Sequence, residues 1–371
     1  MALTVTFSHD IFTSQAVGGI SRYFCELALA LRADGADIRI PAGRYLNQHL
    51  RDMAPACSPG MLRGRHVQRG RMPVQALRLL NEGWAALATR GGGIFHRTYY
   101  PLVDLMPLRR PLVTTVHDMV WEMYPGEARS YPINSRLKRR AVARADLIIV
   151  PTVATKQDLC RLWDVRPDNV YVVNHGFTPL PAPDAEGPAA ARVHAAPYVL
   201  FVGRRGGYKN FANFLAGYAA SRLPADGVDL LCFGGGAFGP ADMALVAGHG
   251  LTDRVRWMGG DDITMMRAYR DALVFIYPSR CEGFGLPVLE AMGAGCPVAL
   301  AAEAEALVEV AGGAAVTYDA DSRDATVSML ESLAEDGERR RALVLRGRQR
   351  VGDFGWQRCA RETAALYAML A

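Results

Sequence analysis

The chain has 371 residues, of which 50% are hydrophobic and 21% are charged, and its formal net charge at pH 7 is +5. This composition is ordinary for a globular protein, and the length is sufficient for two domains, each with its own core. The first residues carry neither a basic segment nor a long apolar run, and no apolar stretch reaches about 18 residues, so we expect neither a signal peptide nor a transmembrane helix.

Seven cysteines are scattered along the chain, and no two of them stand in a CxxC spacing. This pattern argues against a disulfide framework and a zinc site, and it fits a reducing cytoplasm. The positive charge is uneven, because residues 1–185 hold 23 Lys and Arg against 15 Asp and Glu, whereas the remainder holds 19 against 22. The basic excess gathers in residues 61–80 and 136–144. Such segments either attract an anionic partner or form solvated helix faces, and both interpretations stay open.

Short β-branched runs alternate with longer helical patterns along both halves of the chain. In the first half the predicted strands are residues 3–7, 36–40, 93–97, 111–117, 146–151 and 170–174. In the second half they are residues 198–203, 228–234, 254–259, 272–277, 296–301 and 313–318. Several of these runs are continuously apolar, which is typical of parallel strands that are buried on both faces. The alternation therefore predicts βαβ units and doubly wound sheets.

A segment rich in proline and alanine separates the two halves. We predict a first domain over residues 1–180, a linker over 181–197 and a second domain over 198–355. Residues 41–75 are largely polar, and we predict a loop or insertion there rather than a strand. Two Rossmann-like domains of this kind are expected to leave an interdomain cleft at the carboxyl ends of their strands, where ligands bind.

Glycines and cations precede several of the predicted helices. Gly18 and Gly19 stand before an amphipathic helix, whose first amides are free to face a phosphate. Arg204, Arg205 and Lys209 follow the strand at 198–203 and open the next helix. Cations at this edge of a sheet are favourable where they face an anion such as a diphosphate, and plain surface solvation is the alternative.

A second glycine-rich segment suggests a different ligand. Gly234, Gly236 and Gly239 have the GxGxxG spacing of a dinucleotide-binding loop. However, Pro240 follows at once, and no acidic residue ends a strand about 20 residues later, where NAD binding requires one. We therefore expect no NAD site in this segment.

The stretch SRCEGFGLPVLEAMGAGCPV, residues 279–298, predicts a loop, a short helix and a strand. Pro287 fits the first turn of that helix and Gly293 its end, so that Glu282 lies on the loop and Glu290 on the helix. Ionised carboxylates accept hydrogen bonds, which makes the paired hydroxyls of a ribose or hexose natural partners. Three amides at the helix start are expected to donate to an anion, namely those of Phe284, Gly285 and Leu286.

The run EGFGLPVLEAMGAGCPV resembles the signature of the retaining glycosyltransferases of family 4, which have the GT-B fold. The segments VGRRGGYKN, GGISRYFCELA, VTTVHD and FGWQRCARETAALYAML support the resemblance, which covers nearly the whole chain in the expected order. The resemblance implies an α/β protein with two Rossmann-like, doubly wound domains that face a cleft. It also implies that the last helix, about residues 356–371, crosses back to the first domain.

The same resemblance implies roles for individual residues. Glu290 matches the glutamate that binds the nucleotide ribose, and Glu282 matches the one at the donor sugar. Arg204 and Lys209 match the cations that bind the donor diphosphate. His117 matches a histidine that approaches the sugar and the leaving phosphate. The resemblance also implies that Gly18 and Gly19 lie near the phosphates. As an alternative that stays open, Arg205 shares the phosphate role with Arg204.

The variant GRRGGYKNF is similar to bacterial surface-polysaccharide mannosyltransferase-type enzymes that use GDP-mannose or related GDP-sugars. This similarity implies transfer of a hexose from a nucleotide sugar, with GDP favoured over UDP, to a lipid-linked glycan. We expect a cytoplasmic enzyme, with the basic segments in peripheral contact with an anionic membrane at its inner face. We expect no nucleic-acid partner, because the basic segments lack an aromatic RNP-like run and a zinc module.

In the expected reaction, negative charge builds on the leaving diphosphate, and Arg204, Lys209 and helix-start amides stabilise it. We expect no metal ion and no cofactor besides the nucleotide sugar. Asp319 and Asp321 have a DxD spacing that suggests metal binding in another fold, but a turn or a helix cap is the expected role here.

Two other function classes remain as alternatives. A glycoside hydrolase would use Glu282 and Glu290 as an acid and base pair, at about 5–5.5 or 6.5–9.5 Å from one another. A nucleotide-sugar epimerase or a binding protein would share the two-domain fold. Demand for an activated donor and for an acceptor separates these classes from a transferase.

Overall fold

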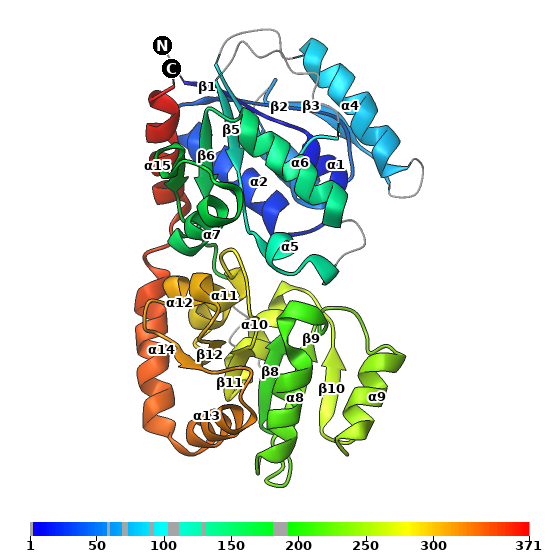
Figure 1. Ribbon diagram of the computed structural model, residues 1–371, viewed down its shortest axis with the longest axis vertical. Coiled ribbons are helices and arrows are strands. Elements are labelled where there is room, and N and C mark those ends of the chain that lie inside the picture. The colour runs from blue at the N-terminus through cyan, green and yellow to red at the C-terminus, as the bar shows by residue number, and fades with distance from the viewer. Residues whose placement is uncertain are drawn as a thin grey trace. The chain divides into compact units, whose positions relative to one another are not determined.

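The computed structural model describes residues 3–57, 60–68, 73–88, 93–102, 111–127, 131–180 and 192–370. These residues form two compact units, one of residues 1–176 and 354–371 and the other of residues 177–353 (Figure 1). Most of the predicted linker, residues 181–191, lies outside the described residues.

The first unit contains a sheet of seven parallel strands in the order β3-β2-β1-β4-β5-β6-β7. The strands are β1 Thr4–Phe7, β2 Asp37–Tyr45, β3 Leu62–His66, β4 Ile94–Arg97, β5 Leu112–Thr115, β6 Leu147–Val150 and β7 Val170–Val172. The helices are α1 Asp10–Ser14, α2 Gly19–Ala33, α3 Gln48–Met53, α4 Val74–Ala88, α5 Val120–Met123, α6 Tyr131–Arg144, α7 Val153–Trp163 and α15 Trp356–Ala368. Strands β4 and β6 are buried along their whole length. The apolar sequence of β6 predicts this burial, whereas β4 also buries the polar residues His96 and Arg97.

The prediction of a loop over residues 41–75 is wrong. Strand β2 continues to Tyr45, α3 follows it, and β3 pairs in parallel with β2 at the edge of the sheet. Residues 63–65 of β3 are exposed, so this edge strand has no need of the apolar side chains that mark a buried one. Polar composition therefore concealed a strand that its neighbour β2 stabilises through backbone hydrogen bonds.

The final helix α15 packs against α2 within the first unit. Its inward side chains Cys359, Ala360, Thr363 and Tyr367 are all buried, and the hydroxyl of Tyr367 lies 2.5 Å from Nδ1 of His96 on β4. The last helix therefore belongs to the unit that begins the chain.

The second unit contains six parallel strands in the order β10-β9-β8-β11-β12-β13. They are β8 Tyr198–Val202, β9 Asp229–Phe233, β10 Val255–Met258, β11 Val274–Tyr277, β12 Val298–Ala301 and β13 Val316–Tyr318. The helices are α8 Phe211–Ala220, α9 Pro240–Gly248, α10 Asp262–Asp271, α11 Leu286–Gly293, α12 Glu305–Ala311, α13 Arg323–Glu335 and α14 Gly337–Val351. All twelve predicted strands are present, and two doubly wound parallel sheets are confirmed.

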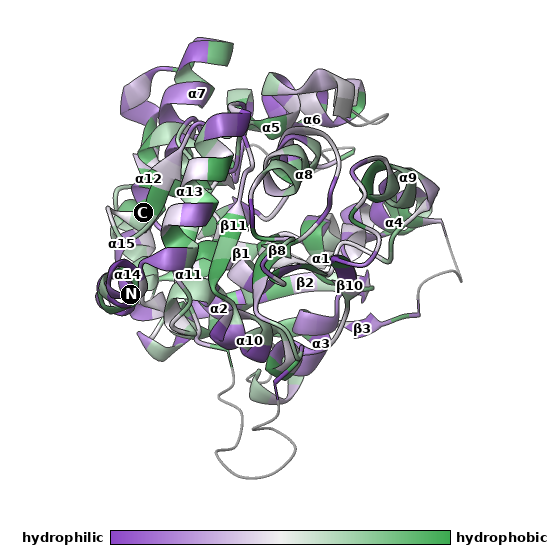
Figure 2. Cartoon of the chain, turned by 90° about the horizontal axis from the view of Figure 1, so that it is seen from below, coloured by the Kyte–Doolittle hydropathy of each residue, from purple (hydrophilic) through white to green (hydrophobic). Residues whose placement is uncertain are grey.

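The strand order of the second sheet reverses between β8 and β11, which pair in parallel with Val199 beside Val274. Both strands are apolar and buried, and they carry hydrophobic colours in Figure 2. The loops that leave their carboxyl ends, residues 203–210 and 278–285, begin at this reversal. In open α/β sheets ligands bind at such a switch point.

Candidate functional site

The loops after β8 and β11 are joined by hydrogen bonds within the second unit. The amide of Arg280 donates to the carbonyl of Tyr208 over 2.9 Å, and the Arg280 guanidinium donates to Asp321 over 2.6 Å. Asn210 has a left-handed φ of 57° and donates from its side chain to the carbonyl of Ala320 over 3.1 Å. These bonds hold the two loops in a defined conformation.

Lys209 and Glu282 form an ion pair across these two loops. Nζ of Lys209 lies 2.5 Å from Oε1 of Glu282, and each side chain is 14% exposed. Nζ also donates to the hydroxyl of Tyr277 over 3.1 Å and lies 4.9 Å from the centre of its ring. The pair is thus largely shielded from bulk water, so its charge interaction is stronger than at an open surface.

Tyr277 is a site residue that the sequence did not single out. Burial raises the pKa of its hydroxyl well above the usual value, and the charge of Glu282 and a hydrogen bond to it raise the pKa further. The hydroxyl therefore keeps its proton, so that it donates to Glu282 and accepts from Lys209. Its place at the end of β11 directs it toward both charges.

The two neighbouring arginines have different surroundings. The Arg205 guanidinium is largely buried and donates to the carbonyls of Gly234 and Gly236, to that of Ala237 and to Asp242. Arg205 thus holds the glycine-rich loop between β9 and α9 in place. Arg204 is exposed, and no ion pair or hydrogen bond of its side chain occurs among the described residues. Of these two residues, only Arg204 has a guanidinium without such partners among the described residues.

Helix α11 begins at the Gly-Phe-Gly turn, as predicted. Gly285 caps it with a φ of +87°, and a Cβ at this position would collide with the side chain of Leu307. Pro287 lies in the first turn, and the helix ends at Gly293. Glu290 is half-buried on this helix and accepts a hydrogen bond from the hydroxyl of Tyr269 over 3.4 Å. The amides of Gly285 and Leu286 lie at the positive end of the helix dipole. Phe284 is buried beside them.

The acidic pair after β13 has a structural role, as expected. Asp319 accepts hydrogen bonds from the amides of Asp321 and Ser322, which closes a turn before α13. Asp321 accepts from Arg280, and this hydrogen bond is the main reason why its pKa lies below the usual value.

His117 lies just beyond β5 in the first unit and is 6% exposed. It packs against the rings of Tyr23, Phe24 and His175, and neither of its ring nitrogens has a hydrogen-bond partner in the described part of the chain. Burial lowers its pKa well below the usual value, and His175 adds to this effect. His117 is therefore a neutral imidazole with unused hydrogen-bonding capacity.

Gly18 and Gly19 lie at the start of α2, as predicted. Gly18 is the N-cap, and a Cβ there would collide with the side chain of Gln15, whose Oε1 accepts from the amide of Ser21 over 3.2 Å. Gly19 is exposed. The Gln15 side chain thus occupies the space beside Gly18 and caps one amide of the first helical turn.

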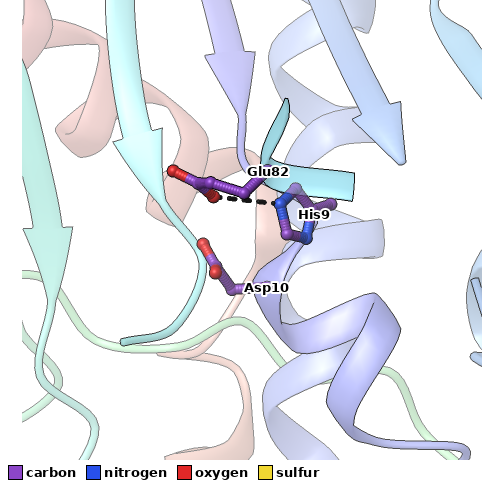
Figure 3. Close-up of side chains that lie close together, drawn as sticks. All are labelled: His9, Asp10 and Glu82. Atoms are coloured by element: carbon purple, nitrogen blue, oxygen red, sulfur yellow. Dashed lines mark hydrogen bonds and ion pairs between the residues drawn. The ribbon is translucent and has the colours of Figure 1, made fainter. Parts of the chain in front are cut away.

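His9, Asp10 and Glu82 form a second polar cluster in the first unit, shown in Figure 3. Their ligand atoms lie within 4.8 Å of one another, as in a metal site. However, Nη1 of Arg97 lies 3.5 Å from Asp10 and 3.6 Å from Glu82 and supplies positive charge. Burial opposes ionisation of Asp10, yet the charges of His9 and Arg97 hold its pKa below the usual value. We interpret the cluster as a buried ion network rather than a metal site.

Family models match both units of the chain. A Glycosyltransferase Family 4 model matches residues 17–179, and a Glycosyl transferases group 1 model matches residues 188–350.

Named relatives align over most of the chain. The chain is 27% identical to the O-antigen chain mannosyltransferase B of Escherichia coli, over 95% of this chain and 96% of that protein. It is 28% identical to the D-inositol 3-phosphate glycosyltransferase of Thermobispora bispora, over 94% of this chain and 89% of that protein.

Solved structures share the fold. The sucrose-phosphate synthase of Thermosynechococcus elongatus has a TM-score of 0.73 at 22% identity, covering 100% of this chain and 99% of that one. WaaG, a glycosyltransferase involved in lipopolysaccharide biosynthesis, has a TM-score of 0.68 at 16% identity, covering 98% of this chain and 99% of that one. These neighbours agree with the predicted GT-B fold.

Proposed function

Because the chain belongs to the glycosyltransferases, with a family 4 region over residues 17–179 and a group 1 region over residues 188–350, we propose that it is a retaining hexosyltransferase. Its donor is a nucleotide diphosphate sugar. The observation that carries this proposal is the pairing of Lys209 with Glu282 at the switch point of the second sheet. Lys209 supplies a cation for the diphosphate of the donor, and Glu282 supplies a carboxylate for its sugar.

The proposed donor site assigns the diphosphate to Arg204 and Lys209. Arg204 is exposed and Lys209 is partly exposed, and both follow β8 at the edge where the sheet order reverses. When the diphosphate binds, Lys209 turns from Glu282 to a phosphate oxygen, which frees Glu282 to accept hydrogen bonds from the sugar. Glu290 accepts from the ribose hydroxyls, and the amides of Gly285 and Leu286 donate to phosphate oxygens.

The bond between the anomeric carbon and the diphosphate oxygen breaks with development of negative charge on that oxygen. Arg204 and Lys209 stabilise this charge, which is the largest catalytic contribution of the proposed site. The acceptor hydroxyl attacks from the same face and gives its proton to the leaving phosphate, so the configuration is retained. Lys209 and Arg204 supply the charge compensation, and we propose that the reaction needs no metal ion.

We propose that His117 contacts the donor sugar through its neutral imidazole. Its two unpartnered ring nitrogens among the described residues support this role. A neutral ring accepts or donates one hydrogen bond at each nitrogen, whereas a protonated ring would require burial of a charge.

For the substrates, we propose a GDP-sugar of the mannose type and a lipid-linked glycan acceptor of surface polysaccharide or O-antigen biosynthesis. The E. coli relative, an O-antigen chain mannosyltransferase, supports this choice. We propose that the enzyme acts at the cytoplasmic face of the membrane; the seven cysteines are all unpaired, in agreement with a reducing compartment. No helix among the described residues has the length and apolar composition to cross a bilayer.

Thermal shift with GDP, UDP and ADP tests the donor assignment. A nucleotide that binds the folded chain raises its melting temperature by mass action, and we expect GDP to give the largest rise. Turnover of GDP-mannose with and without a glycan acceptor, and with a chelator, completes the test. Release of free mannose without acceptor would support a hydrolase, a new sugar nucleotide would support an epimerase, and loss of turnover in chelator would contradict metal independence.

A further inference from the structure

Helix α4 in the first unit exposes large apolar side chains and buries two polar ones. Leu79, Leu80 and Trp84 are exposed, at 47%, 56% and 39%, although large apolar side chains usually face the core. Glu82 of the same helix is buried, and Asn81 beside it is buried too. The outward arc of α4, which also includes Gln75, Ala76 and Gly83, carries no charged residue.

The polar residues of α4 are fixed toward the protein by specific partners. Glu82 pairs with His9 over 3.1 Å in the ion network of Figure 3. Asn81 donates to the backbone carbonyl of Arg44 over 2.6 Å, and Arg78 donates to the carbonyl of Tyr100 over 2.5 Å. These contacts set the rotation of α4 about its axis, so its apolar arc cannot turn inward without breaking them.

Helix α6 lies on the same face of the sheet as α4. Both helices connect parallel strands and advance across the sheet in the same direction, α4 from β3 to β4 and α6 from β5 to β6, so right-handed crossovers put them on one face. Both also bind one short segment, because Arg78 donates to the carbonyl of Tyr100 and Arg140 donates to that of Pro101 over 2.9 Å (Figure 1).

The exposed face of α6 is basic. Arg136 and Arg139 are exposed and have no acidic partner among the described residues, and Ile133 of the same face is 59% exposed. An apolar arc on one helix thus accompanies uncompensated arginines on its neighbour. This combination is typical of protein surfaces that rest on anionic bilayers, where apolar and tryptophan side chains enter the interface and cations meet headgroup phosphates.

We propose that the outward faces of α4 (Leu79, Leu80 and Trp84) and α6 (Ile133, Arg136 and Arg139) together dock on an anionic lipid bilayer. An apolar protein partner, or a second copy, explains the leucines and the tryptophan but gives no anion to the arginines. This proposal rests on the proposed function, because a lipid-linked acceptor is what brings the enzyme to a membrane. The surface itself is defined without reference to the reaction.

Flotation with vesicles of phosphatidylglycerol and phosphatidylcholine tests this surface. We expect the full chain to float with vesicles rich in phosphatidylglycerol, and to bind less as salt rises. The double variant Leu80→Gln/Trp84→Gln should reduce the partition coefficient at least tenfold, since it removes two apolar side chains from the interface. The double variant Arg136→Gln/Arg139→Gln should reduce it about fivefold per arginine and remove most of the salt dependence.

Leu345→Gln provides the matched control, because Leu345 is 62% exposed on α14 of the second unit and lies outside the proposed surface. Equal flotation of the chain and both double variants would overturn the proposal. Unchanged flotation with a shift from dimer to monomer in Leu80→Gln/Trp84→Gln would assign the α4 face to a second copy instead. GDP binding is measured on every variant, so that failure of the donor assignment is recognised separately from failure of membrane docking.

Discussion

Nζ of Lys209 lies 2.5 Å from Oε1 of Glu282, and this ion pair connects the loops that leave the adjacent strands β8 and β11. The pair compensates two charges that are each 14% exposed in the absence of ligand. Under the proposed function, the diphosphate replaces Glu282 as the anionic partner of Lys209, and sugar hydroxyls replace Lys209 as the hydrogen-bond donors to Glu282. The ion pair thus holds both side chains at the site until the donor binds, and Lys209 then contributes its charge to the diphosphate.

Lys209→Ala tests the cationic half of this pair. We expect kcat to fall about 10²–10³-fold with a nucleotide sugar, because one preorganised partner of the leaving diphosphate is lost. Lys209→Arg should recover part of the activity, since it restores the charge. Steady-state turnover measures both effects, and near-normal turnover of the alanine variant would remove Lys209 from the phosphate site.

Tyr277→Phe tests the hydroxyl that bridges Lys209 and Glu282. We expect kcat/KM to fall about five- to tenfold, because one hydrogen bond to each charged group is lost while the ion pair remains. Tyr198→Phe is the control, since its hydroxyl donates to the carbonyl of Ala268 over 2.8 Å in the core of the same unit. The two variants should lose similar stability, but only the Tyr277 variant should lose activity.

Arg204 and Arg205 are expected to separate function from stability. Arg204→Ala should lower turnover about 10²–10³-fold, with a change in the free energy of unfolding of about 0.5 kcal/mol or less. Arg205→Ala should lower the free energy of unfolding by about 2 kcal/mol, because the carbonyls of Gly234 and Gly236 lose their donor. Urea unfolding and steady-state turnover of both variants measure these effects. If Arg204→Ala lost stability and Arg205→Ala lost turnover, the two roles would be exchanged.

The glycine-rich loop between β9 and α9, which Arg205 holds, is expected to tolerate no side chain at Gly235. Gly235 has a φ of +66°, and a Cβ there would collide with the carbonyl oxygen of Gly203. Gly235→Ala should therefore lower the free energy of unfolding by about 3 kcal/mol. Gly227→Ala is the matched control, because Gly227 has a φ of +79° with open space around its Cα, so that only about 1 kcal/mol of backbone strain is expected. Equal losses in urea unfolding would show that the collision is relieved at no cost.

Three buried histidines predict acid sensitivity of the first unit. Burial lowers the pKa of His96 and of His175 to about 3, and that of His117 falls well below its usual value near 6.5. Below pH 6.5 the unfolded chain takes up protons that the folded chain does not, so stability falls as the pH falls toward 3. The loss is up to about 1.4 kcal/mol per pH unit for each histidine, and well above pH 6.5 the histidines contribute no pH dependence.

Hydrogen exchange at pH 7.5, 6.5 and 5.5 measures this effect for each unit. Protection of β4 and β5 in the first unit should decrease between pH 6.5 and 5.5 and change little between 7.5 and 6.5. An equal decrease in β8 and β11 of the second unit would show that another process destabilises the whole chain in acid.

A strand that is buried on both faces can be recognised from its apolar composition alone. Strand β11, Val274–Tyr277, is buried throughout, and its apolar run identifies it without any partner. Strand β3, Leu62–His66, is largely exposed and contains two arginines and a glycine, so only its pairing with β2 makes it a strand. Local sequence does not contain that pairing.

The same distinction applies to the site. Glu282, Glu290 and Lys209 stand in recognisable local patterns. Tyr277 is the last residue of an apolar strand, and no local pattern marks it as a site residue. Its relevance depends on contacts with residues 68 and 5 positions away, which only the fold brings together. Arg204 and Arg205 are adjacent and chemically identical, and only the carbonyls around Arg205 tell them apart.

The return of α15 to the first unit has a consequence for biosynthesis. Residues 177–353 are contiguous, so the second unit is complete once they have left the ribosome. The first unit lacks α15 until residues 356–368 have followed the whole second unit, and His96 and Tyr367, which are hydrogen-bonded in the folded protein, are separated by 271 positions. The unit whose synthesis begins first is therefore completed after the second unit, and the nascent chain must keep the surface that α15 will cover free of misassociation until α15 emerges.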